Sequence, residues 1–239
     1  MVDSMAEKTG RNNDFDYCST LASIVNGERP EAKTLLQSGS TGNNLKIIRS
    51  VVQKVDAKDT LEVGLACGVS ALAFLATLAG GEKTDFSHTA IDPYQSSAWH
   101  SLGIKHVEEA GFSKNFTCIH EPSSIALASL VKANRKFDVI YVDGSHLFED
   151  VFVDMYFCNM LTRVGGYVLM DDSTDPHVSK VIRFMRSNFC NILQESTFDD
   201  AVQLTLKRRL GRLLGYRQLT IFTKRTDSRR VWNAKFSSF

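Results

Sequence analysis

The sequence has little proline, no closely spaced cysteine pair and almost no net charge. Its 239 residues contain four Pro and fifteen Gly, which excludes a collagen-like or proline-rich chain. The five Cys form no C-x-x-C pair and are odd in number, which argues against a disulfide framework or a zinc ribbon and favours a reducing, cytoplasmic compartment. Hydrophobic residues make up 43% and charged residues 23%, so the chain is expected to form one globular domain with appendages.

An apolar leader and a convincing membrane span are also missing. The first twenty residues are polar, so no secretory signal is expected. Residues 63–81 carry no charge and contain Gly64-x-x-x-Gly68, a pattern that also occurs in dimerising transmembrane helices. Because small and hydroxyl residues dominate this stretch and Glu62 precedes it directly, a strand, a glycine turn and a buried helix explain it better.

Charge is distributed unevenly along the chain. Residues 205–239 contain ten Lys or Arg against one Asp, whereas acidic residues outnumber basic ones in the remainder. Such a basic segment could meet an anionic partner, but a solvated surface is the more frequent explanation.

Strand-like and helix-like segments alternate after about residue 57. The expected strands are 60–63, 88–91, 116–120, 137–142, 166–170, 189–194 and 218–223, and the expected helices between them are 70–79, 98–110, 124–132, 148–161 and 178–187. This alternation predicts an α/β fold, a Rossmann-like doubly wound seven-stranded sheet with helices on both faces.

The chain divides into four predicted parts. Residues 1–15 are polar and expected to be mobile, and 16–56 show apolar residues at helical spacing, which predicts an N-terminal helical cover. The main α/β domain is expected at 57–226 with a basic insert at about 205–217, followed by a basic tail at 227–239. In such sheets ligands bind beyond the carboxyl ends of the strands.

The turn after the first expected strand contains Gly64 and Gly68. Glycines let a backbone turn approach a ligand closely, at the start of a helix. The dinucleotide fingerprint G-x-G-x-x-G fails, because Ala66 and Val69 occupy its second and third glycine positions. Asp92 ends the second strand, where an acid can accept hydrogen bonds from ribose hydroxyls.

With these features the chain from about residue 61 to 224 resembles the class I S-adenosylmethionine-dependent methyltransferases. The matching residues are Glu62-x-Gly64-x-x-x-Gly68-x-Ser70, Ile91-Asp92, Ser123-Ser124, the run from Phe137 to Asp143-Gly-Ser-His146, and the run from Gly165 to Asp171-Asp172. The resemblance implies that the glycine turn lies against the methionine part of the cofactor, that Asp92 holds the ribose and that the Ser123-Ser124 turn borders the adenine.

The cofactor-binding residues implied in this way are Glu62, Gly64, Gly68, Ser70, Asp92, Ser123, Ser124 and Asp143. Ala66 departs from the glycine common at its position. Other readings stay open for four of the residues: Glu62 could be a structural carboxylate beneath the turn, Asp92 could be an N-cap or a surface turn acid, and the two serines could cap the next helix.

Three carboxylates are expected at one edge of the sheet: Asp143 ends the fourth strand, and Asp171 and Asp172 end the fifth. Their mutual repulsion favours a shared cation, and oxygen ligands suit a hard divalent ion such as Mg²⁺. Adjacent strand residues point to opposite faces, so both members of the pair can face a metal only if the strand has ended. Without a metal, Asp172 and Ser173 could cap the next helix.

His146 lies three residues after Asp143. The arrangement Asp143-x-x-His146 with Asp171-Asp172 resembles metal-dependent small-molecule O-methyltransferases, in particular sugar O-methyltransferases of the macrocin type. That resemblance implies Mg²⁺ on Asp143, Asp171 and Asp172, and His146 as the catalytic base beside Asp143. Catechol O-methyltransferase is more distantly similar, with Lys and Asn in place of His146 and Asp172. No role is assigned to His88, His100, His106, His120 or His177.

The expected function is methyl transfer from S-adenosylmethionine to a hydroxyl of a small molecule, such as a sugar or polyol, with a divalent metal. The alternatives are a metal-free methyltransferase acting on nitrogen or carboxylate, a nucleic-acid methyltransferase using the basic segment 205–235, and a cofactor-binding relative without catalysis. The segment has few aromatic residues for base stacking, so nucleic acid is the weaker expectation. A homo-oligomer is compatible with the sequence.

Overall fold

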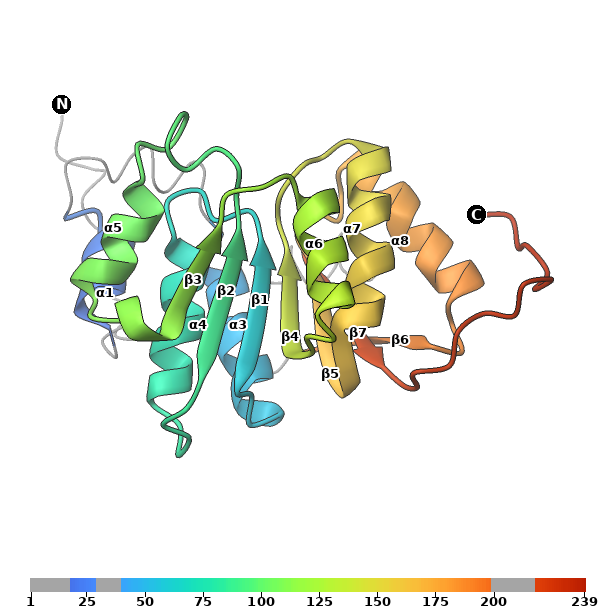
Figure 1. Cartoon of the computed structure of the whole chain (residues 1–239), viewed down its shortest axis with the longest axis horizontal. Coiled ribbons are helices and arrows are strands. Elements are labelled where there is room, and N and C mark those ends of the chain that lie inside the picture. Colours follow the sequence, from blue (N-terminus) through green and yellow to red (C-terminus); the bar gives the residue numbers. More distant parts are fainter. Residues whose placement is uncertain (1–17, 29–39, 199–217) are drawn as a thin grey trace, which may run out of the picture.

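The computed structural model describes residues 18–28, 40–198 and 218–239. In this part of the chain, seven strands form one sheet in the order β3-β2-β1-β4-β5-β7-β6 (Figure 1). The strands are β1 (Asp59–Val63), β2 (Ser87–Ile91), β3 (Phe116–Ile119), β4 (Phe137–Val142), β5 (Thr162–Met170), β6 (Leu193–Ser196) and β7 (Thr220–Lys224). Only β7 runs antiparallel to its neighbours β5 and β6.

The central strands read as apolar runs because helices cover both of their faces. In β4, Val139, Ile140 and Tyr141 are all completely buried, which is the pattern of a parallel strand inside an α/β sheet. The predicted doubly wound sheet of seven strands is confirmed. Two strand predictions need correction: β5 begins at Thr162, earlier than expected, and the strand expected at 189–194 lies at Leu193–Ser196.

Helices form a layer on each face of the sheet (Figure 1). They are α1 (Ser19–Val25), α3 (Gly42–Lys54), α4 (Val69–Ala79), α5 (Leu102–Glu109), α6 (Ser123–Lys132), α7 (Phe148–Leu161) and α8 (Pro176–Asn188), with a short 3₁₀ turn η2 (Ser113–Asn115). One apolar core lies between the sheet and the layer of α1, α3 and α4, and a second lies under α6, α7 and α8. The predicted coverage of both faces is therefore confirmed.

The helix expected from residue 98 begins later, at Leu102. His100 and Ser101 have φ values of 49° and 59°, and this left-handed conformation cannot continue a right-handed helix. Residues 93–101 therefore form turns that leave the end of β2 and bring Trp99 towards the glycine turn.

The N-terminal helices belong to the same body as the sheet. Leu21 and Ile24 of α1 and Ile48 and Val51 of α3 are buried in the core that includes α4. The segments predicted as a mobile N-terminus at 1–15 and a basic insert at 205–217 lie outside the described residues, and the four-part division stays a prediction. Among the described helices, none has the length and apolar character needed to cross a membrane.

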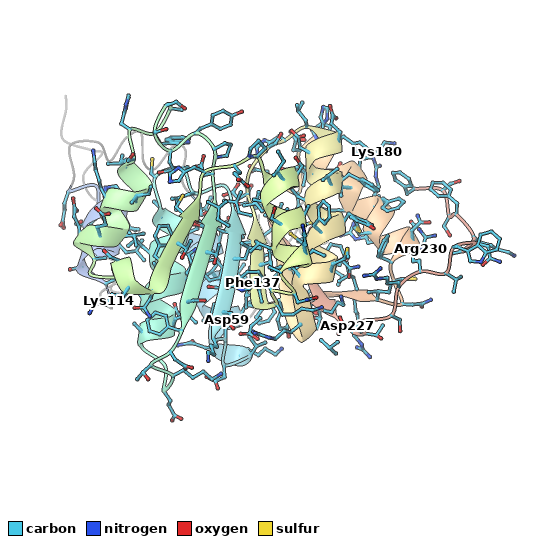
Figure 2. The ribbon with its side chains drawn as sticks, viewed as in Figure 1. Asp59, Lys114, Phe137, Lys180, Asp227 and Arg230 are labelled. Carbon is cyan, nitrogen blue, oxygen red and sulfur yellow. The ribbon has the colours of Figure 1, made fainter. Side chains whose placement is uncertain are left out.

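The carboxyl ends of β1, β2, β3 and β4 meet at the upper edge of the sheet in Figure 1. Asp59, labelled in Figure 2, is the first residue of β1 and marks the opposite edge. There Arg163 pairs with Asp59 and Asp138, both at 2.8 Å. Apart from Glu62, which lies within β1, the residues predicted to bind ligands follow the carboxyl ends of β1 to β5.

Candidate active site

The turn after β1 touches the end of β4. Gly64 has φ +90°, and a Cβ built there would lie 2.1 Å from the backbone oxygen of Asp143, so only glycine fits. Gly68 has φ +78° and closes the turn at the start of α4. Ala66 has φ 44°, a left-handed conformation that costs a non-glycine residue on the order of 1 kcal/mol. The alanine that departs from the resemblance therefore adopts a glycine-like backbone.

Asp92 holds this turn in place. Its Oδ2 accepts hydrogen bonds from Ala66 N at 2.9 Å and from Gln95 Nε2 at 2.8 Å. Its Oδ1 accepts from Tyr94 N at 2.8 Å. The carboxylate is only 4% exposed, yet the residue lines a cavity. Oδ1 has a single protein donor among the described residues, which makes it the oxygen best placed for the predicted ribose contact.

Glu62 lies beneath the turn. It is completely buried, and its Oε2 accepts a hydrogen bond from Ser70 Oγ at 2.6 Å. Its Oε1 lies 3.3 Å from His88 Nε2. Glu62 lines neither of the two cavities described below. Its position gives no direct contact with a cofactor and agrees with the alternative that it is a structural carboxylate beneath the turn. His88, to which the sequence assigned no role, completes this buried network through Thr60 Oγ1, 2.8 Å from its Nδ1.

Two adjoining cavities follow the glycine turn. The larger, about 460 Å³, extends from Asp92 and Tyr94 to the start of α6 and to Leu147. The smaller, about 290 Å³, extends towards Ser40 and His146. Both are lined by Gly64, Ala66, Trp99, Asp143 and Gly144. Of the predicted site residues, Gly64, Ser70, Asp92, Ser123, Ser124, Asp143, His146 and Asp172 line one or both cavities, and Glu62, Gly68 and Asp171 do not.

A cluster of ionisable groups lies in the smaller cavity. Asp143, His146 and Asp172 each offer one potential ligand atom, and these atoms lie within 4.8 Å of one another. His146 Nε2 is 3.0 Å from Asp172 Oδ2. Asp172 has φ 45°, which shows that the strand has ended, so its carboxylate turns towards the loop that follows β4.

Asp171 lines neither cavity, and its carboxylate is held by protein groups. Both of its carboxylate oxygens accept from Asn44 Nδ2, at 2.8 and 2.9 Å, and Oδ2 also accepts from the Tyr141 hydroxyl. Gln218 Nε2 is 3.3 Å from Oδ1. His146, and not Asp171, therefore shares the cluster with Asp143 and Asp172, and the metal set of Asp143, Asp171 and Asp172 stays a prediction. The alternative that Asp172 caps α8 is wrong, since Asp175 accepts from the first N–H groups of that helix.

Burial and the closeness of the acidic side chains raise the pKa values of two of them. Burial, followed by the neighbouring charges of Asp171, Asp172 and Glu62, raises the pKa of the Asp143 carboxyl well above its usual range. Burial likewise raises the pKa of Asp171. Bound cations relieve this kind of repulsion, and the donors of Asp143, His146 and Asp172 suit a divalent metal ion. The donor set of this cluster therefore fits the kind of metal that the resemblance implies.

Sequence reasoning expected an N-terminal helical cover but did not identify the residues through which it reaches the site. Ser40 precedes α3 and lines the smaller cavity, with its Oγ 2.8 Å from the Tyr141 hydroxyl and 3.4 Å from Asp143 Oδ2. Asn44, in the first turn of α3, bonds Asp171. Residues 38–43 looked like a break between helices, and nothing in their composition indicated a contact with residues about 100 positions away.

Comparisons with known proteins concern the domain and its fold. Residues 61–173 match the family model described as a methyltransferase domain. TomG, an O-methyltransferase from Streptomyces achromogenes solved with SAM, has a TM-score of 0.65 and 18% identity over 87% of this chain and 90% of its own. An O-methyltransferase from Bacillus cereus solved with SAH has a TM-score of 0.64 and 16% identity over 86% and 91%. No curated protein sequence matches the chain.

The sheet order, the glycine turn and the acid after β2 define the fold of a class I methyltransferase. Residues 61–173 match a methyltransferase domain, and the fold is that of O-methyltransferases solved with SAM or SAH. The resemblance stated from the sequence is thereby confirmed.

Proposed function

We propose that this enzyme transfers a methyl group from S-adenosylmethionine to a hydroxyl of a small molecule, assisted by a divalent cation. One observation carries the proposal: the two cavities meet at Gly64 and Asp143, so the cofactor cleft opens directly onto the cluster of Asp143, His146 and Asp172. Methyl donor and acceptor would then lie on either side of the same loop. The O-methyltransferases of similar fold support the choice of oxygen as acceptor.

The larger cavity suits the adenosine half of the cofactor. Asp92 offers Oδ1 to the ribose, and Ser123, Ser124 and Leu147 line the end that would hold the base. The methionine half would follow the glycine turn towards Ser70 at the start of α4, where helix N–H groups favour a carboxylate. A dinucleotide is not expected, since the second and third fingerprint glycines are missing.

The smaller cavity suits the acceptor. Asp143 and Asp172 offer carboxyl oxygens on one side, and the His146 side chain is 49% exposed beside them. A bound cation would lower the pKa of an acceptor hydroxyl and orient it. His146 would accept the hydroxyl proton, and the Asp172 carboxylate, with Oδ2 3.0 Å from Nε2, would orient the ring.

His146 has a second possible role, because the same Nε2 atom could bind the cation. The two roles give different results for His146→Ala. Loss of a base lowers kcat and removes the acidic limb of the pH profile while cation affinity changes little. Loss of a ligand weakens cation binding, measured without acceptor by titration with Mg²⁺ or Mn²⁺.

The experiment that tests the function is calorimetric titration with S-adenosylhomocysteine, followed by methyl transfer to panels of hydroxyl, amine and carboxylate acceptors, with and without EDTA. We expect binding with or without the cation, and transfer to hydroxyl acceptors only with it. Absence of cofactor binding would refute the proposal as a whole. Full activity after exhaustive chelation, or transfer to amines or carboxylates alone, would favour the metal-free alternative.

A further inference from the structure

Gln95 is a buried amide beside the glycine turn and has no part in the proposed function. It is completely buried, whereas Tyr94, Ser96 and Ser97 around it are exposed. The segment that carries Gln95 leaves the end of β2 above the upper edge of the sheet (Figure 1). Because a polar side chain is rarely buried unless it is hydrogen-bonded, the partners of Gln95 indicate what it does.

The Gln95 amide donates two hydrogen bonds. Its Nε2 donates to Asp92 Oδ2 and to the backbone oxygen of Ala66, both at 2.8 Å. Both partners are acceptors, so the NH₂ group must face them and Oε1 must face away. Oε1 accepts no hydrogen bond from the residues that the structure describes. The polar contribution of Gln95 is therefore its pair of N–H donors.

These bonds close a hydrogen-bonded ring around Ala66. The Ala66 N–H donates to Asp92 Oδ2 at 2.9 Å, and the Ala66 C=O accepts from Gln95. The two peptide groups on either side of the Ala66 Cα are thereby both fixed, which sets the backbone angles of this residue. Ala66 has φ 44°, in the left-handed region that alanine disfavours and glycine does not. The ring therefore holds an alanine in a conformation that it adopts rarely without support.

The same ring orients the carboxylate of Asp92. Its Oδ2 accepts from Gln95 and also from the N–H groups of Leu65, at 3.3 Å, and Ala66. Its Oδ1 accepts from Tyr94 N at 2.8 Å. Three donors on Oδ2 fix the rotation of the carboxylate group, so Oδ1 is the oxygen that remains for a ligand.

We propose that Gln95 is a positioning residue for the cofactor, because its NH₂ group holds Ala66 in the left-handed conformation and keeps Oδ1 of Asp92 available for the ribose. The inference rests on the proposed function, since it needs the cofactor in the larger cavity, which Ala66 and Asp92 both line. Gln95 itself lines neither cavity, so it acts through these two residues. The ring also explains how the turn accommodates alanine at a position where the resemblance has glycine.

The alternative is that Gln95 only fills space between the turn and the start of α5. Packing there is close: a Cβ at Gly103 would lie 2.7 Å from the Ala66 oxygen and 3.2 Å from Gln95 Oε1. Gln95→Met separates the two explanations, because methionine keeps the length of the side chain and removes both donors. If Gln95 only fills space, methionine replaces it without loss of cofactor affinity. If Gln95 positions the turn, affinity falls although the shape is kept.

The first test measures the Kd of S-adenosylhomocysteine by calorimetric titration. We expect Gln95→Met to raise Kd roughly 5- to 50-fold, which corresponds to the loss of one or two hydrogen bonds. Val181→Ala is the control for stability, because Val181 of α8 is completely buried and lines neither cavity. It should lower the melting temperature and bind the ligand like the wild type. A Kd within about twofold of the wild type in folded Gln95→Met overturns the proposal, as does equal weakening in Val181→Ala.

The second test asks whether Gln95 acts through the backbone of Ala66. Because glycine adopts the left-handed conformation readily, Ala66→Gly should restore roughly fivefold of the affinity lost in Gln95→Met. In the wild type the same change should alter Kd by less than about twofold. An equal effect of Ala66→Gly in both backgrounds would show that the two residues act independently, and that result overturns the proposal.

A folding defect does not leave the proposal untested. If Gln95→Met does not fold, the double variant Gln95→Met/Ala66→Gly should fold and bind S-adenosylhomocysteine, since glycine needs less support from the ring. Failure of the double variant to fold as well would assign Gln95 to the stability of the fold and overturn the proposal. A wild type that does not bind S-adenosylhomocysteine would refute the proposed function itself, so the two failures can be told apart.

Discussion

Replacing Gly64 with alanine tests the contact between the glycine turn and the end of β4. The added Cβ would lie 2.1 Å from the Asp143 backbone oxygen, and real Cβ contacts are not shorter than 3.0 Å. The ends of β1 and β4 would have to separate by about 0.9 Å. That movement strains the hydrogen bond from Asp143 N to Val63 O, which is 2.9 Å long. Asp143 would move with its backbone, away from the cluster that it helps to form.

Gly111 provides a matched control. It also has a left-handed backbone, φ +83°, but a Cβ there would meet nothing within 4 Å. Gly111→Ala should therefore carry only the conformational cost, on the order of 1 kcal/mol. Gly64→Ala should carry a similar cost together with roughly 1–3 kcal/mol for the steric overlap. The difference between the two variants isolates the close approach.

Urea denaturation of both variants measures these free energies of unfolding. Calorimetric titration with S-adenosylhomocysteine then tests the site, where a displacement of about 1 Å can lower catalysis roughly 100-fold. We expect Gly111→Ala to bind the cofactor product like the wild type and Gly64→Ala to bind it much more weakly. If Gly64→Ala is no less stable than Gly111→Ala and binds equally well, the turn does not touch β4 as described.

Three further predictions concern the charged groups. Burial raises the pKa of Asp154, in α7, to about 6 in the folded state, above its unfolded value of about 3.9. The native state therefore binds more protons than the unfolded state between these values, and the free energy of unfolding falls as pH rises through this interval. Asp154→Asn should be more stable than the wild type by up to about 3 kcal/mol at pH 8 but not at pH 3.5, and urea curves that show the same difference at both pH values would contradict this. Asp172→Asn should weaken Mn²⁺ binding in a titration without acceptor, whereas Asp171→Asn should largely spare it; the reverse order would return Asp171 to the metal site. His146→Ala should lower kcat by roughly 10²–10⁴ with product affinity intact, and a change of only a few fold would remove His146 as the base.

Local sequence determined the fold and the elements that carry the site. Runs without charged side chains, such as Val139–Val142, form buried strands where helices cover both faces of the sheet. The roles of Gly64 and of the acids at the strand ends could be predicted from the sequence, because residue type alone limits which side chains a tight turn or a buried strand end can accommodate. The start of α5 could not be predicted, because His100 and Ser101, the left-handed residues before it, are not residue types that signal this conformation.

Tertiary structure decided which of two adjacent acids faces the cavity. In the sequence, Asp171 and Asp172 are equivalent; in the fold, Asn44 and Tyr141 surround the first with donors, and a left-handed φ turns the second towards His146. Asn44 precedes Asp171 by 127 positions, a separation over which no periodicity or spacing extends. Asp154 likewise has no hydrogen-bond partner among the described residues because of the way α6 and α7 pack against each other. Residue types therefore set the available chemistry, and only the assembled layers set which groups meet.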